Sequence, residues 1–415
     1  MSTSPSPAPG RPHAWNRASF LILLLFLVSM NLRPAITSLS PVLDTVSSDL
    51  GMNGVVTSWL TSIPVLCMGI FAPLAALAGS RFGVERTLTA CLVLIGGAIG
   101  LRAFTDTAWS LLGTAFLAGV GMAVAGPLVS AFIKRYFESR AAAMVGVYTA
   151  GMGIGSAICA GLVVPVMRGF NGSWRAALAV WVVYAVIALI FWIPTVHRHA
   201  PAIETNVTPV RLGELPWRVP RVWLLMLVFG LQSGLYYAIS TWLAPLVHEN
   251  GSTLAVSGAV LTVYSVVQLV ANLLAPVMVH RTGHPDRWLL VGSVVLLVGL
   301  VLLNFFSTVL TPWVGAVFVG LGIGGLFPLA LLLPFTEADS PQRVNDWTSA
   351  MLFGGYIFSS LIPMLVGYIK DVLGSYQHAF IALIVLCVVL GATTFAVRPS
   401  ATSVGVDTDT DNLAQ

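Results

Sequence analysis

Long apolar runs separated by short polar stretches make up most of this chain. Each run is roughly 20 residues long, the length that a helix needs to cross the roughly 30 Å hydrocarbon layer of a membrane. The runs cover residues 19–41, 54–78, 87–104, 109–133, 142–166, 173–195, 221–246, 254–279, 288–306, 311–334, 346–369 and 375–397. This pattern predicts an all-α membrane protein with twelve transmembrane helices.

One polar segment divides the twelve runs into two groups of six. Residues 196–219 contain several charges and prolines and are too polar to span a membrane, so we predict a cytoplasmic linker there. A six-helix bundle is expected on either side of it, over residues 17–195 and 220–397. The Pro- and Ser-rich residues 1–16 are expected to form a cytoplasmic tail, and the acidic residues 398–415 a disordered cytoplasmic tail.

The two groups repeat one another at an offset of about 200 residues. The matching features are Arg81-Phe82-Gly83 with Arg281-Thr282-Gly283, Gly119 and Gly121 before Pro127 with Gly320 and Gly322 before Pro328, and Gly172-Ser173-Trp174 with Gly374-Ser375-Tyr376. Such matches in register predict two pseudo-symmetric bundles, arranged as parallel repeats around a central site.

Composition agrees with a membrane protein and narrows the possible functions. The chain is 57% hydrophobic and only 9% charged, against roughly 25% charged in a soluble domain. Its four cysteines and seven histidines show no metal-binding spacing, so we predict no metal and no cofactor. The net charge of +4 is better explained by basic loops than by nucleic-acid binding.

The placement of basic residues predicts the orientation. Of the 20 Lys and Arg residues, one lies in the middle of a run, fifteen fall on the side of the termini, and four fall on the other side, namely Arg102, Arg168, Arg175 and Lys370. Because Lys and Arg accumulate on the cytoplasmic side, both termini are expected in the cytoplasm. No cleavage site follows the first run, which is therefore expected to be retained.

The basic residue in the middle of a run is Arg33, in the sequence SFLILLLFLVSMNLRPAITSLSP. It lies about 21 Å along a run of about 34 Å, where an arginine costs on the order of 3 kcal/mol unless it faces protein or water. Ser29, Thr37 and Ser40 share its helix face. Pro34 removes a backbone donor and predicts a kink beside it. We expect Arg33 and Thr37 to line a cavity; a purely structural arginine is the alternative.

Polar stripes also occur in the seventh and eighth runs. Gln232, Tyr236 and Ser240 share one face, beside Tyr237, and Tyr264, Gln268 and Asn272 share another. Two interpretations remain open, hydrogen bonding between helices or contact with a bound solute. The candidate solute-binding residues on these two runs are Gln232, Tyr236, Tyr237, Gln268 and Asn272.

Tyr148 and Tyr356 occupy related places in the fifth and eleventh runs, each beside glycines, and are further candidates for lining a solute path.

The polar loops after the second and eighth runs hold related charge clusters, namely Arg81, Glu85 and Arg86, and Arg281, Asp286 and Arg287. Each cluster either anchors its loop at the cytoplasmic surface or takes part in gating.

Taken together, these residues resemble the cyanate and nitroimidazole transporter family of the major facilitator superfamily over nearly the whole chain. The motifs that carry the resemblance are Asn31-Leu32-Arg33-Pro34 with Pro41 and Leu43-Asp44, Ile133-Lys134-Arg135, Phe229-Gly230-Leu231-Gln232-Ser233 with Tyr237 and Trp242-Leu243-Ala244-Pro245, and Gly355-Tyr356 with Pro363, Gly367, Asp371 and Gly374-Ser375. One departure is that Ser80 and His280 stand where the superfamily's loop motif has an Asp.

The resemblance implies twelve helices, alternating access and a small polar or anionic solute. We therefore expect a secondary active or facilitative transporter, not an enzyme, in the bacterial plasma membrane, with Arg33 as the central ligand for a cyanate-like anion or a nitroimidazole-like heterocycle. Its expected partners are that solute and the lipid bilayer, with a coupling proton or counter-ion left open, and the expected state is a monomer.

The sequence leaves two other functions open. An exporter of drugs or metabolites, within the same superfamily, is the first alternative. It is less favoured because no Asp or Glu lies mid-run as a proton carrier: Asp44 and Asp49 follow the first run, and Glu337 and Asp339 follow the tenth. A non-transporting membrane sensor is the second alternative, and the sequence has no soluble output domain to support it.

Overall fold

The structure, a computed structural model, describes residues 12–199, 215–306, 308–338 and 340–396. The first part of the chain forms α1 (Pro12–Met30), α2 (Pro34–Thr37), η1 (Ser40–Val42), α3 (Leu43–Asp49), α4 (Gly54–Ile70), α5 (Ala72–Phe82), α6 (Val84–Leu101), η2 (Arg102–Phe104), α7 (Ala108–Phe137), η3 (Glu138–Arg140), α8 (Ala141–Gly169), α9 (Trp174–Ala179) and α10 (Val182–His199). The second part forms α11 (Pro220–Glu249), α12 (Leu254–Thr282), α13 (Pro285–Phe305), α14 (Thr311–Glu337), α15 (Pro341–Leu373) and α16 (Tyr376–Ala396).

The predicted all-α membrane architecture is confirmed. Among the described residues, eleven helical stretches are long and apolar enough to cross a membrane. A twelfth span is the pair α4 and α5, which together cover residues 54–82 and bend by 58° at Phe71. Pro73 explains the bend, because its nitrogen cannot donate to the carbonyl of Gly69 four residues earlier.

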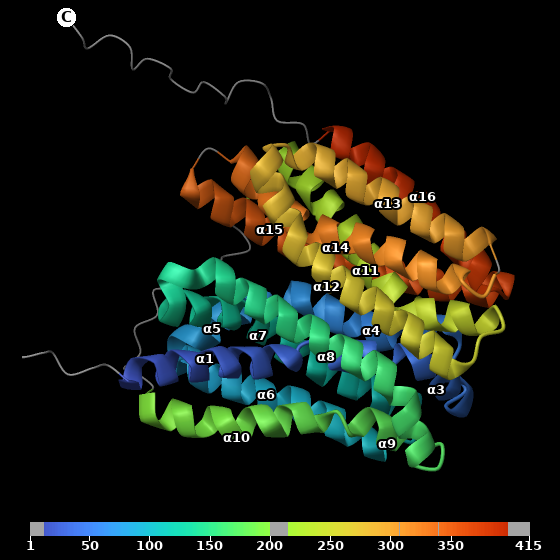
Figure 1. The fold of residues 1–415 in the computed structure, drawn as a ribbon, viewed down its shortest axis with the longest axis horizontal. Coiled ribbons are helices and arrows are strands. Elements are labelled where there is room, and N and C mark those ends of the chain that lie inside the picture. Colours follow the sequence, from blue (N-terminus) through green and yellow to red (C-terminus); the bar gives the residue numbers. More distant parts are fainter. Residues whose placement is uncertain (1–11, 200–214, 307, 339, 397–415) are drawn as a thin grey trace, which may run out of the picture.

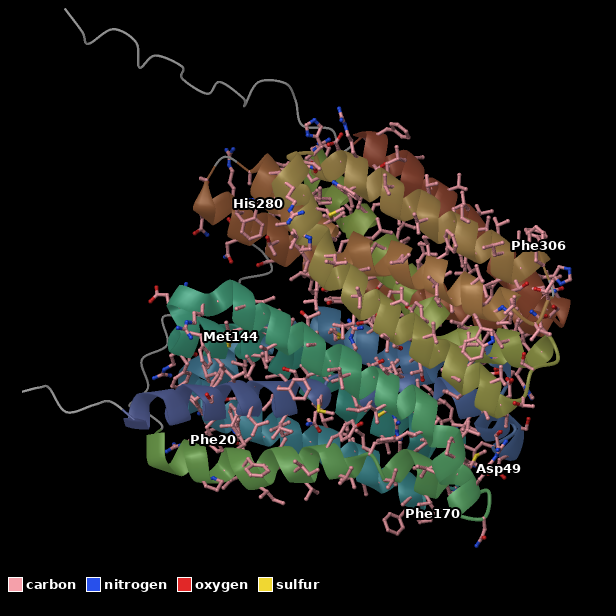
Figure 2. The ribbon with its side chains drawn as sticks, viewed as in Figure 1. Phe20, Asp49, Met144, Phe170, His280 and Phe306 are labelled. Carbon is pink, nitrogen blue, oxygen red and sulfur yellow. The ribbon has the colours of Figure 1, made fainter. Side chains whose placement is uncertain are left out.

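The helices lie side by side in two groups (Figure 1). One group consists of α1–α10 and is here called the first half, and the other consists of α11–α16 and is called the second half. The halves contact each other mainly where α4 packs on α15 and α8 packs on α12. Many apolar side chains point outward from both groups (Figure 2), as expected of helices in contact with lipid tails.

The predicted domain boundaries fall close to helix ends, and parts of them lie outside the described residues. Within the predicted linker 196–219, α10 continues to His199, and residues 200–214 are not described. α1 begins at Pro12, inside the predicted tail 1–16, of which residues 1–11 are not described. The predicted tail 398–415 also lies outside the described residues.

The first span is broken at its polar centre, as the position of Pro34 predicts. α1 ends at Met30, and the helix resumes at Pro34, which takes the first position of α2. Proline is well suited there because the first residues of a helix have no intrahelical acceptor for their N–H groups. Arg33 is the residue just before this new start, with φ −125° and ψ −23°. The break therefore places the arginine at an interruption of the helix.

Several hydrogen bonds join the two halves at the end of the molecule that carries α3 and α9, which also holds Asp49 and Phe170 (Figure 2). We call it the α3 end. There the carboxylate of Asp371, near the end of α15, accepts hydrogen bonds from the backbone N–H groups of Gly54 (2.6 Å) and Val55 (2.9 Å). These are the first two residues of α4, so a negative charge from the second half caps a helix N-terminus of the first.

Two glycines allow this close approach. A Cβ atom on Gly54 would lie 2.5 Å from the carbonyl oxygen of Gly367. Two further bonds cross at the same end: Tyr376 donates to Asp44 (2.8 Å), and Ser40 Oγ donates to the carbonyl of Thr241 (2.7 Å). The two groups of helices diverge toward the opposite end, where α1 begins (Figure 1). The structure is therefore closed at the α3 end.

Replacing Asp371 is expected to weaken this closure. Asp371→Ala removes two charge-assisted hydrogen bonds, so we expect the equilibrium to move toward a state open at the α3 end by about 1–3 kcal/mol, or roughly 5- to 150-fold in population. Spin labels on cysteines introduced at the exposed positions Ser48 and Val372 would report the distance between the halves. The four native cysteines are buried and should react poorly with the label.

Asp49 offers a matched control at the same end. It pairs with Arg175 (2.9 Å) within the first half and makes no bond to the second half among the described residues. Asp49→Ala should therefore leave the label distances unchanged, and Asp371→Asn should give an intermediate shift because an amide keeps one acceptor. An unchanged distance distribution in Asp371→Ala would show that the capping contact does not hold this end closed.

Candidate functional site

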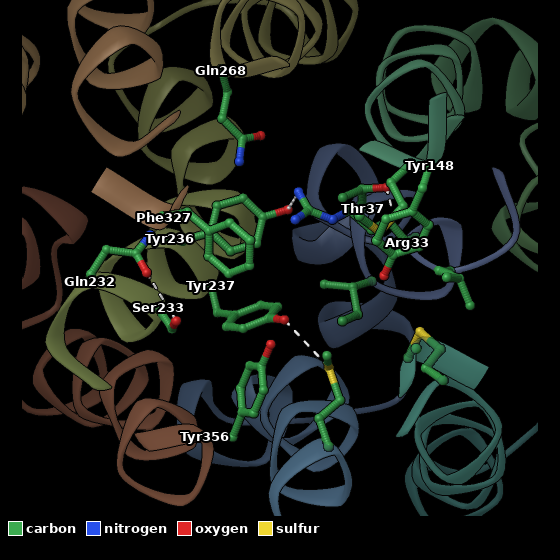
Figure 3. A pocket seen from close by; sticks show the side chains of 16 residues that line it. Arg33, Thr37, Tyr148, Gln232, Ser233, Tyr236, Tyr237, Gln268, Phe327 and Tyr356 are labelled. Carbon is green, nitrogen blue, oxygen red and sulfur yellow. Dashed lines mark hydrogen bonds between the residues drawn. The ribbon is translucent and has the colours of Figure 1, made fainter. Parts of the chain in front are cut away.

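A cavity of about 70 Å³ lies between the two halves at the break in the first span. Its lining comes from both halves (Figure 3): Leu32, Arg33, Ile36, Thr37, Met68, Met122, Gly126, Tyr148 and Met152 from the first, and Gln232, Ser233, Tyr236, Tyr237, Gln268, Phe327 and Tyr356 from the second. A space of this size holds a few water molecules or a solute of a few heavy atoms.

Arg33 supplies the positive charge of the cavity. Its Nη1 donates a hydrogen bond to the hydroxyl of Tyr236 across the boundary between the halves (Figure 3). The guanidinium carbon also lies 4.6 Å from the centroid of the Tyr236 ring, which is a cation–π contact. Among the described residues, no carboxylate forms an ion pair with Arg33, and none lines the cavity.

Aromatic hydroxyl groups surround this cation. Tyr148 comes from α8, Tyr236 and Tyr237 from α11, and Tyr356 from α15. The rings of Tyr236 and Tyr237 meet edge to face, with centroids 4.9 Å apart, and the Tyr237 hydroxyl contacts the sulfur of Met68 in the other half (3.4 Å). The phenols are neutral donors and acceptors. The net charge of the lining is therefore that of Arg33 alone.

The structure brings together eight of the nine predicted solute-binding residues, and their role in binding stays a prediction. Arg33, Thr37, Tyr148, Gln232, Tyr236, Tyr237, Gln268 and Tyr356 line the cavity. Asn272, one turn beyond Gln268 on α12, is half-buried and does not line it.

The two interpretations of the polar stripes apply to different residues of the same stripe. Ser240 and Tyr264 lie within hydrogen-bond distance of each other (3.3 Å), which joins α11 to α12. Gln232 and Gln268 instead reach the cavity wall, and the side-chain oxygen of Gln232 accepts from Ser233 (3.0 Å). One part of each stripe therefore holds helices together, and another part faces the cavity.

The charged loop clusters lie away from the cavity. Arg81, Arg86, Arg281 and Arg287 are exposed, and Asp286 is half-buried. Glu85 is buried within its own half, where it accepts from the hydroxyl of Tyr136 (2.8 Å) and lies 3.6 Å from Arg135. No ion pair between described residues joins either cluster to the opposite half.

Sequence reasoning did not single out several residues that matter in the structure. The apolar part of the cavity lining includes Met68, Met122, Met152 and Phe327. Isolated methionines within apolar runs carry no distinguishing sequence pattern. From the sequence, Asp371 is recognised only as part of a family motif, and no role is assigned to it. Its partners are backbone N–H groups of the other half, which no sequence pattern identifies.

These features define a class of protein: a helical membrane protein with two pseudo-symmetric bundles and a central cavity between them, the architecture of secondary transporters. The sequence model of the Major Facilitator Superfamily matches residues 19–343. The chain belongs to the Major Facilitator Superfamily and is a multi-pass membrane transporter of that family.

Relatives of known name cover nearly the whole chain. The cyanate transport protein CynX of Escherichia coli (strain K12) is 31% identical over 385 residues, which are 91% of this chain and 97% of CynX. The uncharacterized transporter YycB of Bacillus subtilis (strain 168) is 30% identical over 92% of this chain and 94% of its own. The 2-nitroimidazole transporter of Escherichia coli (strain K12) is 28% identical over 89% and 93%. The resemblance inferred from the sequence is thereby confirmed.

Solved structures of other transporters share the fold at low sequence identity. The nucleoside transporter NupG superposes with a TM-score of 0.74 at 12% identity, over 91% of this chain and all (100%) of that one. A D-xylose–proton symporter superposes with a TM-score of 0.72 at 14% identity, over 92% of this chain and 98% of that one. At such identities the match concerns the fold alone.

The position of Arg33 depends on how closely α8 packs against the broken span. A Cβ atom on Gly155 would lie 2.6 Å from the carbonyl oxygen of Met30, at the end of α1. We expect Gly155→Ala to force the helices apart and to cost about 1–3 kcal/mol, despite the higher helix propensity of alanine. A lower Tm of the purified protein in a thermal-unfolding assay would show this.

Gly146, on the same helix, is the matched control, because a Cβ atom there would meet only Leu273 Cδ2 at 3.8 Å. Gly146→Ala should leave the Tm unchanged or raise it, since alanine is favoured over glycine in a helix by about 1 kcal/mol. Equal Tm values for the two variants would mean that the contact between α8 and Met30 does not constrain the fold.

Proposed function

We propose that this protein moves a small monovalent anion, or a small polar heterocycle with an electron-rich group, across the plasma membrane by alternating access. Arg33 is its central ligand. One observation carries the proposal: a single guanidinium lies at the boundary of the two halves, in a cavity that no carboxylate lines. Such a site attracts negative charge because nothing else in the lining neutralises the cation.

The contact between Arg33 and Tyr236 supports a ligand that is exchanged during transport. A phenol oxygen is a neutral acceptor, whereas a solute anion makes a charge-assisted bond, which is roughly twice as strong. An incoming anion can therefore take the place of the Tyr236 hydroxyl on Nη1. Because Arg33 and Tyr236 belong to different halves, this exchange changes a contact between the parts that must move.

The size and lining of the cavity agree with a small, partly apolar solute. The volume of about 70 Å³ suits a few heavy atoms. The tyrosine rings and Met68, Met122 and Met152 offer apolar and aromatic contact beside the cation. Two relatives are named for cyanate and for 2-nitroimidazole. Cyanate fits the volume seen here, whereas the larger 2-nitroimidazole needs the cavity to widen.

The orientation is part of the proposal. With both termini in the cytoplasm, the α3 end faces outward, and the structure is closed to the outside and opens toward the cytoplasm. The excess of Lys and Arg on the side of the termini supports this. In that orientation the clusters Arg81, Glu85 and Arg86, and Arg281, Asp286 and Arg287, lie at the end that must close during the transport cycle. We assign them to the cytoplasmic gate, and residues 196–219 to the link between the bundles.

Export of an apolar drug or metabolite is the second candidate function. The three methionines and Phe327 in the lining favour it. Arg33 does not favour it, because an apolar solute brings no negative charge to a guanidinium that no carboxylate in the lining neutralises. A solute that contacts both Arg33 and the apolar wall satisfies the whole lining, so we favour a small polar or anionic compound.

Removal of the cation is expected to weaken binding strongly. Loss of a charge-assisted contact costs about 1.5–3 kcal/mol, so Arg33→Ala should weaken binding of cyanate or 2-nitroimidazole by about 10- to 150-fold. Arg33→Lys should recover part of it if charge alone matters. Uptake of each labelled compound into proteoliposomes and thermal shift of the purified protein would measure the effect.

Arg168 provides a control for the loss of one positive charge. It is exposed at the end of α8 and does not line the cavity. Arg168→Ala should transport like the parent protein. Normal uptake by correctly inserted Arg33→Ala would contradict the assignment of Arg33 as the central ligand. Transport only of large lipophilic compounds by the parent protein would favour the exporter.

The membrane potential gives an independent test of the charge that moves. A monovalent anion that crosses without a coupled cation is driven by about 2.3 kcal/mol for each 100 mV. Cyanate should therefore accumulate about 50-fold in proteoliposomes held at an inside-positive potential of about 100 mV, whereas a neutral nitroimidazole should not respond. Accumulation of cyanate that follows a pH gradient and ignores the potential would instead indicate proton symport.

A further inference from the structure

A second arginine is buried inside the first half, behind the segment that carries Arg33. Arg102 begins η2 at the end of α6, and its side chain is 1% exposed. Its Nη2 donates to the carbonyl oxygen of Ala35 (2.8 Å), two residues beyond Arg33 on the short helix α2. Arg102 therefore contacts the short helix α2, which follows the break in the first span, and it does not line the cavity.

The rest of the Arg102 guanidinium is unpaired. Neither Nε nor Nη1 has an acceptor among the described residues. The acidic residues at this end are engaged elsewhere: Asp49 and Asp106 lie 2.9 Å and 3.5 Å from Arg175, and Asp44 accepts from Tyr376. One carbonyl oxygen is thus the only acceptor that the described part of the chain provides for a full positive charge.

A buried guanidinium with one acceptor and no opposite charge is energetically unfavourable. A charged group removed from water needs both hydrogen-bond partners and an opposite charge, and a buried pair that lacks one partner is strongly destabilised. Water can satisfy the hydrogen bonds, but it does not neutralise the charge.

We propose that Arg102 binds a small monovalent inorganic anion of the chloride class through Nε and Nη1. The anion neutralises the guanidinium and stays within the first half while the two halves move. It is a resident ion, distinct from the transported solute, and it stabilises the broken segment on which Arg33 lies. The proposal does not depend on the identity of that solute.

The test begins with the unaltered protein. Thermal unfolding of the purified protein is measured in sodium chloride and in sodium gluconate at equal ionic strength, because gluconate is too large for an enclosed site. We expect a chloride-dependent rise in Tm on the order of 5 °C that saturates with concentration, and a similar effect of bromide. Crystals grown in bromide should show an anomalous scattering peak in contact with the Arg102 guanidinium.

Two variants separate this site from the cavity. Arg33→Ala should keep the chloride-dependent rise in Tm, because its guanidinium faces the other side of the break. Arg102→Gln, which removes the charge, should lose the rise, and Arg102→Lys should keep part of it. A chloride effect that disappears in Arg33→Ala and persists in Arg102→Gln would overturn the proposal and place the ion in the cavity.

The experiment remains decisive if Arg102→Gln does not fold, since the measurements on the unaltered protein stand alone. Equal Tm values in chloride and gluconate, together with no bromide peak at Arg102, would overturn the proposal and mean that water alone solvates the guanidinium. A peak at Arg102 with a saturable chloride effect would support it, whatever compound the cavity transports.

Discussion

The structure depends on how a cation is kept inside a membrane-spanning helix. Arg33 is tolerated because the helix stops at Met30 and restarts at Pro34, and because the side chain then reaches a tyrosine of the opposite half. A continuous helix in lipid would have left this charge without a partner. Pro34 therefore explains the break in the first span, and the break places the cation among the polar groups of the cavity.

The segment after the break links the cavity to the closed end. Arg33 contacts Tyr236, Ser40 contacts Thr241, and Asp44 contacts Tyr376, all across the boundary between the halves. These contacts follow one another along a single stretch of chain from mid-bundle to the α3 end. Arg33 thus lies on the same segment that helps to hold the α3 end closed, which connects the proposed solute binding at Arg33 directly to that closure.

Small residues let the halves approach closely while leaving them able to separate. Gly54 meets the backbone at Gly367, and a Cβ atom on Gly258 would lie 2.9 Å from the carbonyl oxygen of Ala160. Contacts of this kind are made by backbone atoms over smooth surfaces, and they are supplemented by a few specific bonds such as those to Asp371. At these positions a larger residue would collide with the backbone of the opposite half, so glycine is needed for the observed packing.

Much of this protein could be predicted from the sequence, because lipid imposes strict rules on a spanning chain. The apolar runs, the repeat of the two halves, the cation at Arg33 and the kink at Pro34 follow from hydrophobicity, spacing and the missing proline donor. Helical periodicity also placed Gln232, Tyr236 and Gln268 on polar faces. It left open whether those faces met another helix or a cavity.

Only the tertiary structure decided which polar groups meet. Asn272 shares its face with Gln268 yet lies outside the cavity, and Ser240 bonds Tyr264. Arg102, which the sequence placed at the membrane surface, is buried against Ala35. Periodicity defines the face of a helix, but the rotation, depth and neighbours of that face come from packing over the whole bundle. The sequence alone therefore determined the spans and the buried charge, and long-range packing determined their partners and which end is closed.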